Sequence, residues 1–231
     1  MIAGVRTYAS LMCSNFRNLE KELAQLKDAG IDGVHFDVMD GRFVPNLALG
    51  PDLARAVRDM TDLEIEAHLM VERPEDYIQL FAGAAIDRIQ VHVESTTNLL
   101  RTIQACSDEF QFVDVVANPL TPLCYLEPVL PLVSGVMVMT VEPGFAGQKV
   151  APGAVQRIAS VRAICPEHSA GGDPFSIEAD GQVNTSTIGS FVRAGVNSVV
   201  LGTSGLYGHK DGFRAALAEL EAAIQTLVPR G

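Results

Sequence analysis

The sequence of 231 residues has no tryptophan, few aromatic residues and only four cysteines. The cysteines lie far apart and form no C-x-x-C or other paired spacing: Cys13, Cys106, Cys124 and Cys165. A disulfide framework is therefore not expected, because disulfide-stabilised domains are short and dense in cysteine. The pattern is typical of reduced thiols in a cytoplasmic protein.

Positive charge is also scarce. There are 17 lysines and arginines against 28 aspartates and glutamates, which gives a net charge of −11. Nucleic acid and anionic membrane surfaces are therefore not expected as partners. An anionic substrate would have to be held by local amide dipoles rather than by overall attraction.

Long hydrophobic runs are missing. The longest charge-free apolar region, residues 128–141, is too short to span a bilayer and is interrupted by Pro131 and Gly135. The first eleven residues carry Arg6 inside their only apolar stretch, which is unlike a signal peptide. We therefore expect a cytoplasmic protein with no membrane association.

What the sequence does have is an alternation of short β-rich runs and helical patterns, repeated about eight times. This order predicts an α/β protein in which one domain, residues 1–231, forms a single (β/α)8 TIM barrel. An open doubly wound sheet is the alternative, but no G-x-G-x-x-G follows the first strand. The expected strands are residues 7–11, 33–39, 63–69, 88–93, 112–117, 135–140, 176–180 and 197–201.

The expected helices lie between these strands. The first runs from an Asn15 cap to a stop at Gly30, and the second begins at Pro51 and ends near Met60. The segment 166–174 is polar and rich in glycine, which predicts an exposed and mobile loop. The remaining helices are expected at residues 74–84, 97–107, 122–130, 152–164, 185–194 and 213–227.

Polar side chains close four of the expected strands. Ser10 ends the first strand, His35 and Asp37 end the second, His68 ends the third and Asp180 ends the seventh. His35 and Asp37 are two residues apart, so they point to the same face of an extended strand. Because barrel active sites form at the carboxyl ends of the strands, all five side chains are expected at one rim.

These histidines and carboxylates suit a divalent metal ion, namely zinc, iron, manganese or cobalt. Each residue also has a simpler interpretation. His35 and Asp37 could be a hydrogen-bonded pair, His68 could bind a loop carbonyl, and Asp180 could cap a helix. Their joint occurrence at matching strand ends favours the metal site.

Three methionines fall at the same rim: Met39, Met70 and Met139. Methionine is often an adaptable filler of a core, so these side chains could belong to the core or to the site. The other histidines are interpreted as supporting or structural for His92 and as surface residues for His168 and His209.

Glycine-rich turns follow the last three expected strands. In barrels of this kind, such turns form a phosphate site from bare backbone amides, so no lysine is required. Lys149 is interpreted as a surface residue or as a weak attractor of anions. The turn residues expected to bind phosphate are Gly144, Ala146, Gly147, Gly181, Gln182, Gly202, Thr203 and Ser204.

With these residues in view, the sequence resembles the ribulose-phosphate 3-epimerase family over nearly its whole length. It departs from the family's usual motifs at Ala9, Ala146 and Gln182. The motifs that carry the resemblance are SLM at 10–12, HFDVMDGRFVPN at 35–46, AHLMV at 67–71, VHVE at 91–94, NPLTP at 118–122, VMTVEPGFAGQK at 138–149, EADG at 178–181 and LGTSGLYG at 201–208.

The resemblance implies a ribulose-phosphate-binding barrel with one divalent metal ion on His35, Asp37, His68 and Asp180. It implies that Asp37 and Asp180 act as the acid/base pair and that the three rim methionines cap the reacting carbons. It also implies a homo-oligomer and a small phosphosugar substrate. The motifs SLMC, TVEPGFAGQ and GTSGLY are more similar to the allulose-6-phosphate 3-epimerase branch.

This chemistry matches the residues. Inverting C3 of a 2-ketose removes a proton from one face and returns one to the other, so two carboxylates must flank a planar enediolate. A metal ion would stabilise the developing negative charge as a Lewis acid. Ser10 is expected to hydrogen-bond a substrate oxygen.

Two other functions stay open at this point. A phosphosugar aldolase or decarboxylase could use the same barrel, but a Schiff-base aldolase needs a lysine at a strand end. A barrel that only binds phosphosugars would be expected to lack a ligand or a carboxylate, and none is missing. The four lysines all fall in expected helices or loops: Lys21, Lys27, Lys149 and Lys210.

Overall fold

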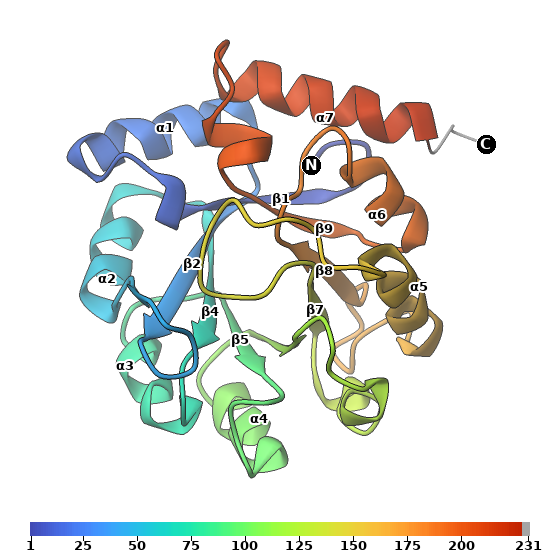
Figure 1. Cartoon of the computed structure of the whole chain (residues 1–231). Helices are drawn as coiled ribbons and strands as arrows, with labels where there is room; N and C mark the ends of the chain where they lie inside the picture. Colours follow the sequence, from blue (N-terminus) through green and yellow to red (C-terminus); the bar gives the residue numbers. More distant parts are fainter. Residues whose placement is uncertain (228–231) are drawn as a thin grey trace.

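Eight parallel strands close into a barrel in the computed structural model, which describes residues 1–227 (Figure 1). The first strand pairs with both the second and the last, which closes the barrel and rules out the open sheet. Residues 228–231 of the predicted domain lie outside the described part of the chain. The strands are β1 (Arg6–Ser10), β2 (Gly33–Asp40), β4 (Glu64–Met70), β5 (Arg88–His92), β6 (Phe112–Ala117), β7 (Gly135–Met139), β8 (Ser176–Asp180) and β9 (Ser198–Leu201).

Helices surround the barrel on its outside (Figure 1). The expected start at Pro51 and the expected stop at Gly30 are confirmed, since Gly30 has a φ of 94° that glycine adopts easily. Asn15 caps a 3₁₀ turn, Phe16–Asn18, by accepting from the Arg17 amide. The helices are α1 (Leu19–Ala29), α2 (Pro51–Met60), α3 (Ile78–Ala82), α4 (Leu99–Ser107), α5 (Ala154–Ile164), α6 (Ile188–Ala194) and α7 (Phe213–Leu227).

The prediction of a helix over residues 122–130 is wrong. The segment contains two 3₁₀ turns, Leu123–Tyr125 and Leu130–Leu132, between β6 and β7. Pro128 explains the difference, because it lies inside the expected helix and lacks the amide proton that a helix interior needs.

Three other segments differ in part from the expectation. The helix expected at 74–84 is divided into a 3₁₀ turn, Pro74–Asp76, and the short α3. A two-residue strand, β3 (Leu47–Ala48), pairs antiparallel with the end of β2. The loop 166–174 is mostly exposed, as expected, but its ends pair at His168 and Pro174. Within residues 1–227, no helix is long and apolar enough to cross a membrane.

Successive side chains of each strand point alternately into the barrel and out toward the helices, which separates a polar barrel interior from an apolar outer layer. On β2, Val34 and Phe36 point outward and are fully buried against the helices, where the ring of Phe36 meets that of Phe81 edge to face. His35 and Asp37 are the intervening residues of the same strand and therefore point inward. The hydrophobic core thus lies between the strands and the helices.

Buried and partly buried charges fill the amino-terminal half of the barrel interior. Arg88 Nη1 lies 2.8 Å and 2.9 Å from the two carboxylate oxygens of Asp114. Glu64 accepts from the hydroxyl of Tyr8 at 2.8 Å and forms an ion pair with Arg6. These four charged side chains are therefore paired with opposite charges, which lowers the cost of removing them from water.

Gly33 permits the close approach of β2 to its neighbours. A Cβ atom at this position would lie 2.5 Å from Tyr8 Cε1 and 2.7 Å from the backbone oxygen of Glu64. We expect Gly33→Ala to lower the free energy of unfolding by about 1–3 kcal/mol, measured by urea denaturation. Gly83→Ala is the control, since a Cβ there meets nothing within 4 Å and its φ is −76°. Equal stability of the two variants would contradict this account.

Candidate active site

The pairing of strands brings the predicted ligands together. In the register of β2 with β4, Asp37 lies beside His68 and Met39 lies beside Met70. On the other side of the barrel, β7 and β8 place Met139 beside Asp180. All of these residues lie at or near the carboxyl ends of their strands.

Four side chains, His35, Asp37, His68 and Asp180, could hold a metal ion. Each offers one ligand atom, and these atoms lie within 4.8 Å of one another. His35 Nε2 is 3.4 Å from Asp37 Oδ1, and His68 Nδ1 is 3.9 Å from both Asp37 Oδ1 and Asp180 Oδ2. Metal–ligand bonds of about 2.0–2.2 Å place neighbouring ligand atoms roughly 3–4 Å apart, so the separations suit a shared cation.

The nitrogens that face this centre lack other partners. His35 Nε2 and His68 Nδ1 are buried and make no hydrogen bond with any described residue. A buried polar atom without a partner is costly, and a metal ion between imidazole nitrogens and carboxylates removes that cost. The donor set therefore fits a divalent cation.

The opposite nitrogen of each histidine is held in place. His35 Nδ1 lies 2.7 Å from Glu66 Oε1, and His68 Nε2 lies 2.8 Å from His92 Nε2. Hydrogen bonds of this kind orient metal-binding imidazoles in proteins. The interpretation of His92 as a supporting residue agrees with its position. Glu66 is missed by the sequence reasoning, although it precedes His68 by two residues on the same face.

Burial and mutual repulsion perturb the ionisation of the cluster. Burial, together with the charges of Asp37 and Glu178, raises the pKa of Asp180 to about 7 against the opposing effect of His35. Burial would lower the pKa of His35, but the carboxylates of Asp37 and Glu66 raise it well above its usual value. Burial and the neighbouring histidines lower the pKa of His68. A bound cation would favour the ionised carboxylates and the neutral imidazoles.

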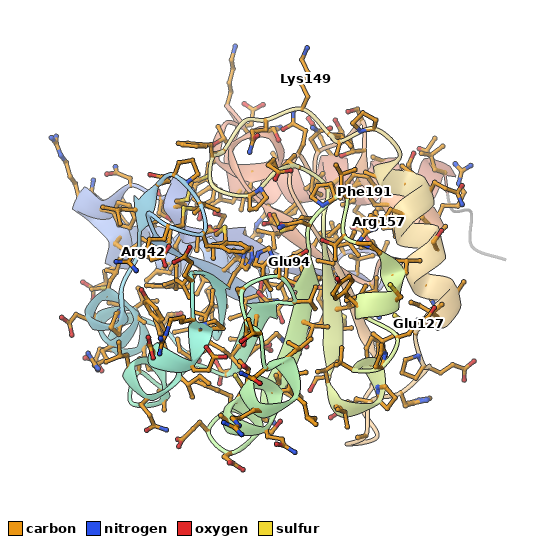
Figure 2. All side chains as sticks on the ribbon, turned by 60° about the horizontal axis from the view of Figure 1, so that its bottom comes forward. Arg42, Glu94, Glu127, Lys149, Arg157 and Phe191 are labelled. Carbon is orange, nitrogen blue, oxygen red and sulfur yellow. The ribbon has the colours of Figure 1, made fainter. Side chains whose placement is uncertain are left out.

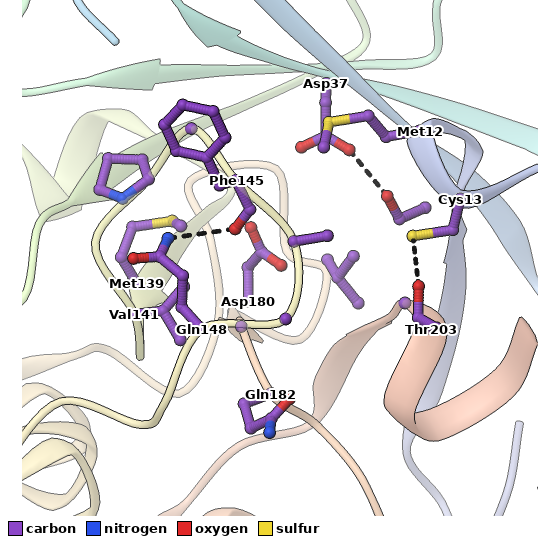
Figure 3. Close-up of a pocket in the computed structure, with 18 of the residues that line it drawn as sticks. Met12, Cys13, Asp37, Met139, Val141, Phe145, Gln148, Asp180, Gln182 and Thr203 are labelled. Atoms are coloured by element: carbon purple, nitrogen blue, oxygen red, sulfur yellow. Dashed lines mark hydrogen bonds between the residues drawn. The ribbon is translucent and has the colours of Figure 1, made fainter. Parts of the chain in front are cut away.

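A pocket opens above this cluster at the carboxyl end of the barrel (Figure 3). His35 and His68 lie below it and are fully buried. Every other predicted site residue lines it: Ser10, Asp37, Met39, Met70, Met139, Gly144, Ala146, Gly147, Asp180, Gly181, Gln182, Gly202, Thr203 and Ser204. The strand ends and the three glycine-rich turns therefore share one cavity.

Several lining residues were not predicted. Met12 packs with Met39 and Met70, and the Cys13 thiol accepts a hydrogen bond from Thr203 at 3.4 Å. Their position directly after the strand that ends at Ser10 was the available signal. The other unpredicted lining residues are Val141, Glu142, Pro143, Phe145, Gln148 and Val200.

Ser10 contacts a candidate ligand directly. Its hydroxyl donates to Asp37 Oδ2 at 2.8 Å, while Asp37 Oδ1 faces the two histidines. The two oxygens of this carboxylate thus have different surroundings. Ser10 orients Asp37 in addition to lining the pocket.

The turns around the pocket depend on left-handed backbone conformations. Gly144 and Gly181 have φ angles of 115° and 108°, which favour glycine, while Gln182 adopts a φ of 49°. The Gln182 side chain accepts a hydrogen bond from Ser204 at 3.0 Å, which joins the turns after β8 and β9. Asn46 Nδ2 donates to the Gly144 oxygen at 2.8 Å, and the loop after β7 crosses the barrel mouth (Figure 1).

The remaining candidates lie elsewhere. Lys149 extends away from the molecule into solvent (Figure 2). His168 is exposed, and His209 lies 3.3 Å from Glu219. Among the described residues, no lysine or arginine lines the pocket.

Comparison with known proteins agrees with the resemblance seen in the motifs. The profile of the Ribulose-phosphate 3 epimerase family matches residues 6–207. A ribulose-phosphate 3-epimerase of Bacillus subtilis is 38% identical over 219 residues, which are 95% of this chain and 99% of that protein. The chloroplastic ribulose-5-phosphate-3-epimerase of Arabidopsis thaliana is 40% identical over 204 residues, 87% of this chain and 71% of that protein.

A likeness of fold extends further. A mutant tryptophan synthase alpha-subunit of Pyrococcus furiosus superposes with a TM-score of 0.66 at 14% identity, covering 99% of each chain. That likeness shows the barrel alone. The profile match and the identity over most of the chain show more: this chain belongs to the ribulose-phosphate 3-epimerase family.

Proposed function

We propose that this protein is a metal-dependent ketose-phosphate 3-epimerase that interconverts D-ribulose 5-phosphate and D-xylulose 5-phosphate. Membership of the family makes it an isomerase acting on carbohydrates. One observation carries the proposal. Two carboxylates, Asp37 and Asp180, reach one pocket from different strands and lie beside two histidine nitrogens without partners.

In this mechanism Asp37 and Asp180 exchange protons with opposite faces of C3. One carboxylate removes the proton next to the carbonyl, and the other returns a proton to the opposite face of the planar enediolate. The reverse reaction exchanges their roles. A zinc, iron, manganese or cobalt ion held by His35, Asp37, His68 and Asp180 would supply Lewis-acid stabilisation of the negative charge.

The surrounding residues would bind and enclose the substrate. The apolar side chains of Met39, Met70 and Met139 would cap the reacting carbons and exclude water, which strengthens electrostatic interactions in the site. Ser10 would hold Asp37 in position and hydrogen-bond a substrate oxygen.

The phosphate would bind at the turns after β7, β8 and β9. Backbone amides and polar side chains there can hold an anion without a lysine. No lysine or arginine of residues 1–227 lines the pocket, so the backbone amides and polar side chains of these turns are the donors available to the phosphate. We assign the contacts to Gly144, Ala146, Gly147, Gly181, Gln182, Gly202, Thr203 and Ser204.

A pentulose phosphate is the proposed substrate because the similar relatives named above are ribulose-phosphate epimerases. D-Allulose 6-phosphate, converted to D-fructose 6-phosphate, is the second candidate because of the motifs SLMC, TVEPGFAGQ and GTSGLY. A Schiff-base aldolase is disfavoured, since no strand of the described chain carries any of the four lysines.

We further propose that residues 1–231 form one domain and that the protein is a cytoplasmic homo-oligomer. Four cysteines without disulfide partners among the described residues support the cytoplasmic location. The oligomer rests on family resemblance.

The first test is a coupled assay of both ketose phosphates with protein of known metal content. We expect epimerisation of D-ribulose 5-phosphate, loss of activity after complete metal removal, and recovery when zinc, manganese, cobalt or iron is restored. Activity with D-allulose 6-phosphate alone would show that this hexulose phosphate, not D-ribulose 5-phosphate, is the substrate. Full activity without metal would contradict the Lewis-acid role.

The second test replaces each carboxylate. Asp37→Asn and Asp180→Asn should each lower kcat by about 10²- to 10⁴-fold, assayed with saturating metal, because each removes one proton-transfer group. Asp59→Asn is a control, since Asp59 is an exposed aspartate of α2 and does not line the pocket. Near-normal epimerisation and C3 deuterium exchange in both catalytic variants would disprove the two-carboxylate mechanism.

The third test concerns Gln182. Gln182→Gly should raise the free energy of unfolding by about 1 kcal/mol, because glycine tolerates the φ of 49°. It should also raise KM about tenfold with little change in kcat, since the hydrogen bond that the Gln182 side chain would donate to the charged phosphate is lost. Thermal unfolding and steady-state kinetics measure the two effects. An unchanged KM would remove Gln182 from the phosphate site.

A further inference from the structure

A line of hydrogen bonds leads away from the candidate metal centre through β4 and β5. His68 Nε2 lies 2.8 Å from His92 Nε2, and His92 Nδ1 lies 3.2 Å from Glu94 Oε2. The other oxygen of Glu94 accepts from the backbone amide of Asn118 at 2.9 Å and from the Thr121 hydroxyl. Both imidazole rings in this line are fully buried.

Each hydrogen bond in this line needs one donor and one acceptor, so the state of one end determines the state of the other. An ionised Glu94 can only accept. His92 must then carry its proton on Nδ1, and its Nε2 accepts from His68. His68 is therefore protonated on Nε2 and keeps a lone pair on Nδ1, the nitrogen that faces Asp37 and Asp180.

We propose that Glu94 is a positioning residue that sets the tautomers of His92 and His68 and thereby keeps the metal-facing nitrogen of His68 unprotonated. This inference rests on the proposed metal site and extends it. Glu94 acts through His92, since it is neither among the four candidate ligands nor among the residues that line the pocket in the described chain.

The surroundings of this line hold it in one arrangement. The rings of His68 and His92 are nearly parallel, with their centroids 4.9 Å apart. The ring of Phe43, a residue of the loop after β2, has its centroid 4.6 Å from that of His92. A half-turn of the His92 ring would put carbon atoms where its two nitrogens lie, and would therefore break the hydrogen bonds to His68 and Glu94. Glu94 lies near the barrel mouth, close enough to Arg157 of α5 for its charge to act on that guanidinium (Figure 2).

The backbone amide of Asn118 fixes which atoms donate and which accept along this line of hydrogen bonds. A hydroxyl such as that of Thr121 can donate or accept, but a backbone N–H can only donate. In Glu94→Gln the new amide must keep its oxygen toward Asn118, so its NH₂ group faces His92 Nδ1. His92 must then be protonated on Nε2 and His68 on Nδ1, where the proton blocks the metal site.

Glu75→Gln is a matched control. Glu75 is also a carboxylate at this end of the barrel, in the 3₁₀ turn Pro74–Asp76, and the side chains that donate to it are the hydroxyls of Thr96 and Thr102. Both hydroxyls can turn to suit an amide. The control therefore removes the same charge by the same isosteric change, but neither of its side-chain partners is a histidine whose tautomer could change.

Two measurements test the proposal. In zinc titrations against a competing chelator, Glu94→Gln should weaken binding about 10- to 100-fold, the range found for groups that orient metal ligands, while Glu75→Gln should match the wild type. In metal-free protein with ¹⁵N-labelled histidine, nuclear magnetic resonance should show His68 protonated on Nε2 and His92 on Nδ1. Both tautomers should reverse in Glu94→Gln.

The outcomes separate this proposal from the proposed function. Wild-type protein that binds no zinc would show that the metal site itself is wrong. Zinc binding by the wild type, with the same affinity and tautomers in Glu94→Gln, would overturn the role of Glu94. If Glu94→Gln does not fold, the wild-type spectrum still decides, because a His92 protonated on Nε2 contradicts the proposal.

Discussion

The register between β2 and β4 is the constraint on which the site depends. It sets Asp37 beside His68 at one rim of the barrel, while strand alternation directs both inward. A shift of one residue would turn His68 into the apolar layer and bring Leu69 or Ala67 into the site. Gly33, at the start of β2, lets the strands approach closely enough to keep this register.

The polar interior gives the rim its rigidity. Glu178 accepts from Gln90 at 2.6 Å and from Ser198 at 2.7 Å, and Glu66 accepts from His35 just below the metal-facing nitrogen. These bonds fix side chains in a closely packed and largely dry space, where an unpaired charge would be costly. The candidate metal centre is the place where two imidazole nitrogens are left for a cation.

Much of the fold and most of the pocket could be predicted from the sequence. Barrel geometry converts order along the chain into position, so residues at strand ends such as His35 and Asp180 meet even though they are far apart in sequence. The glycine-rich turns after the last three strands also indicated residues that line the pocket. The helix expected at 122–130 failed because Pro128 outweighs its apolar pattern. The link from His68 to Glu94 could not be foreseen, since it depends on the register of neighbouring strands and on side-chain rotamers.

Anomalous diffraction from crystals of zinc-loaded protein tests the central claim most directly. The account predicts one zinc ion at the carboxyl end of the barrel, bound by His35 Nε2, His68 Nδ1 and one oxygen each of Asp37 and Asp180. No peak at saturating zinc, or a peak outside this cluster, would contradict it.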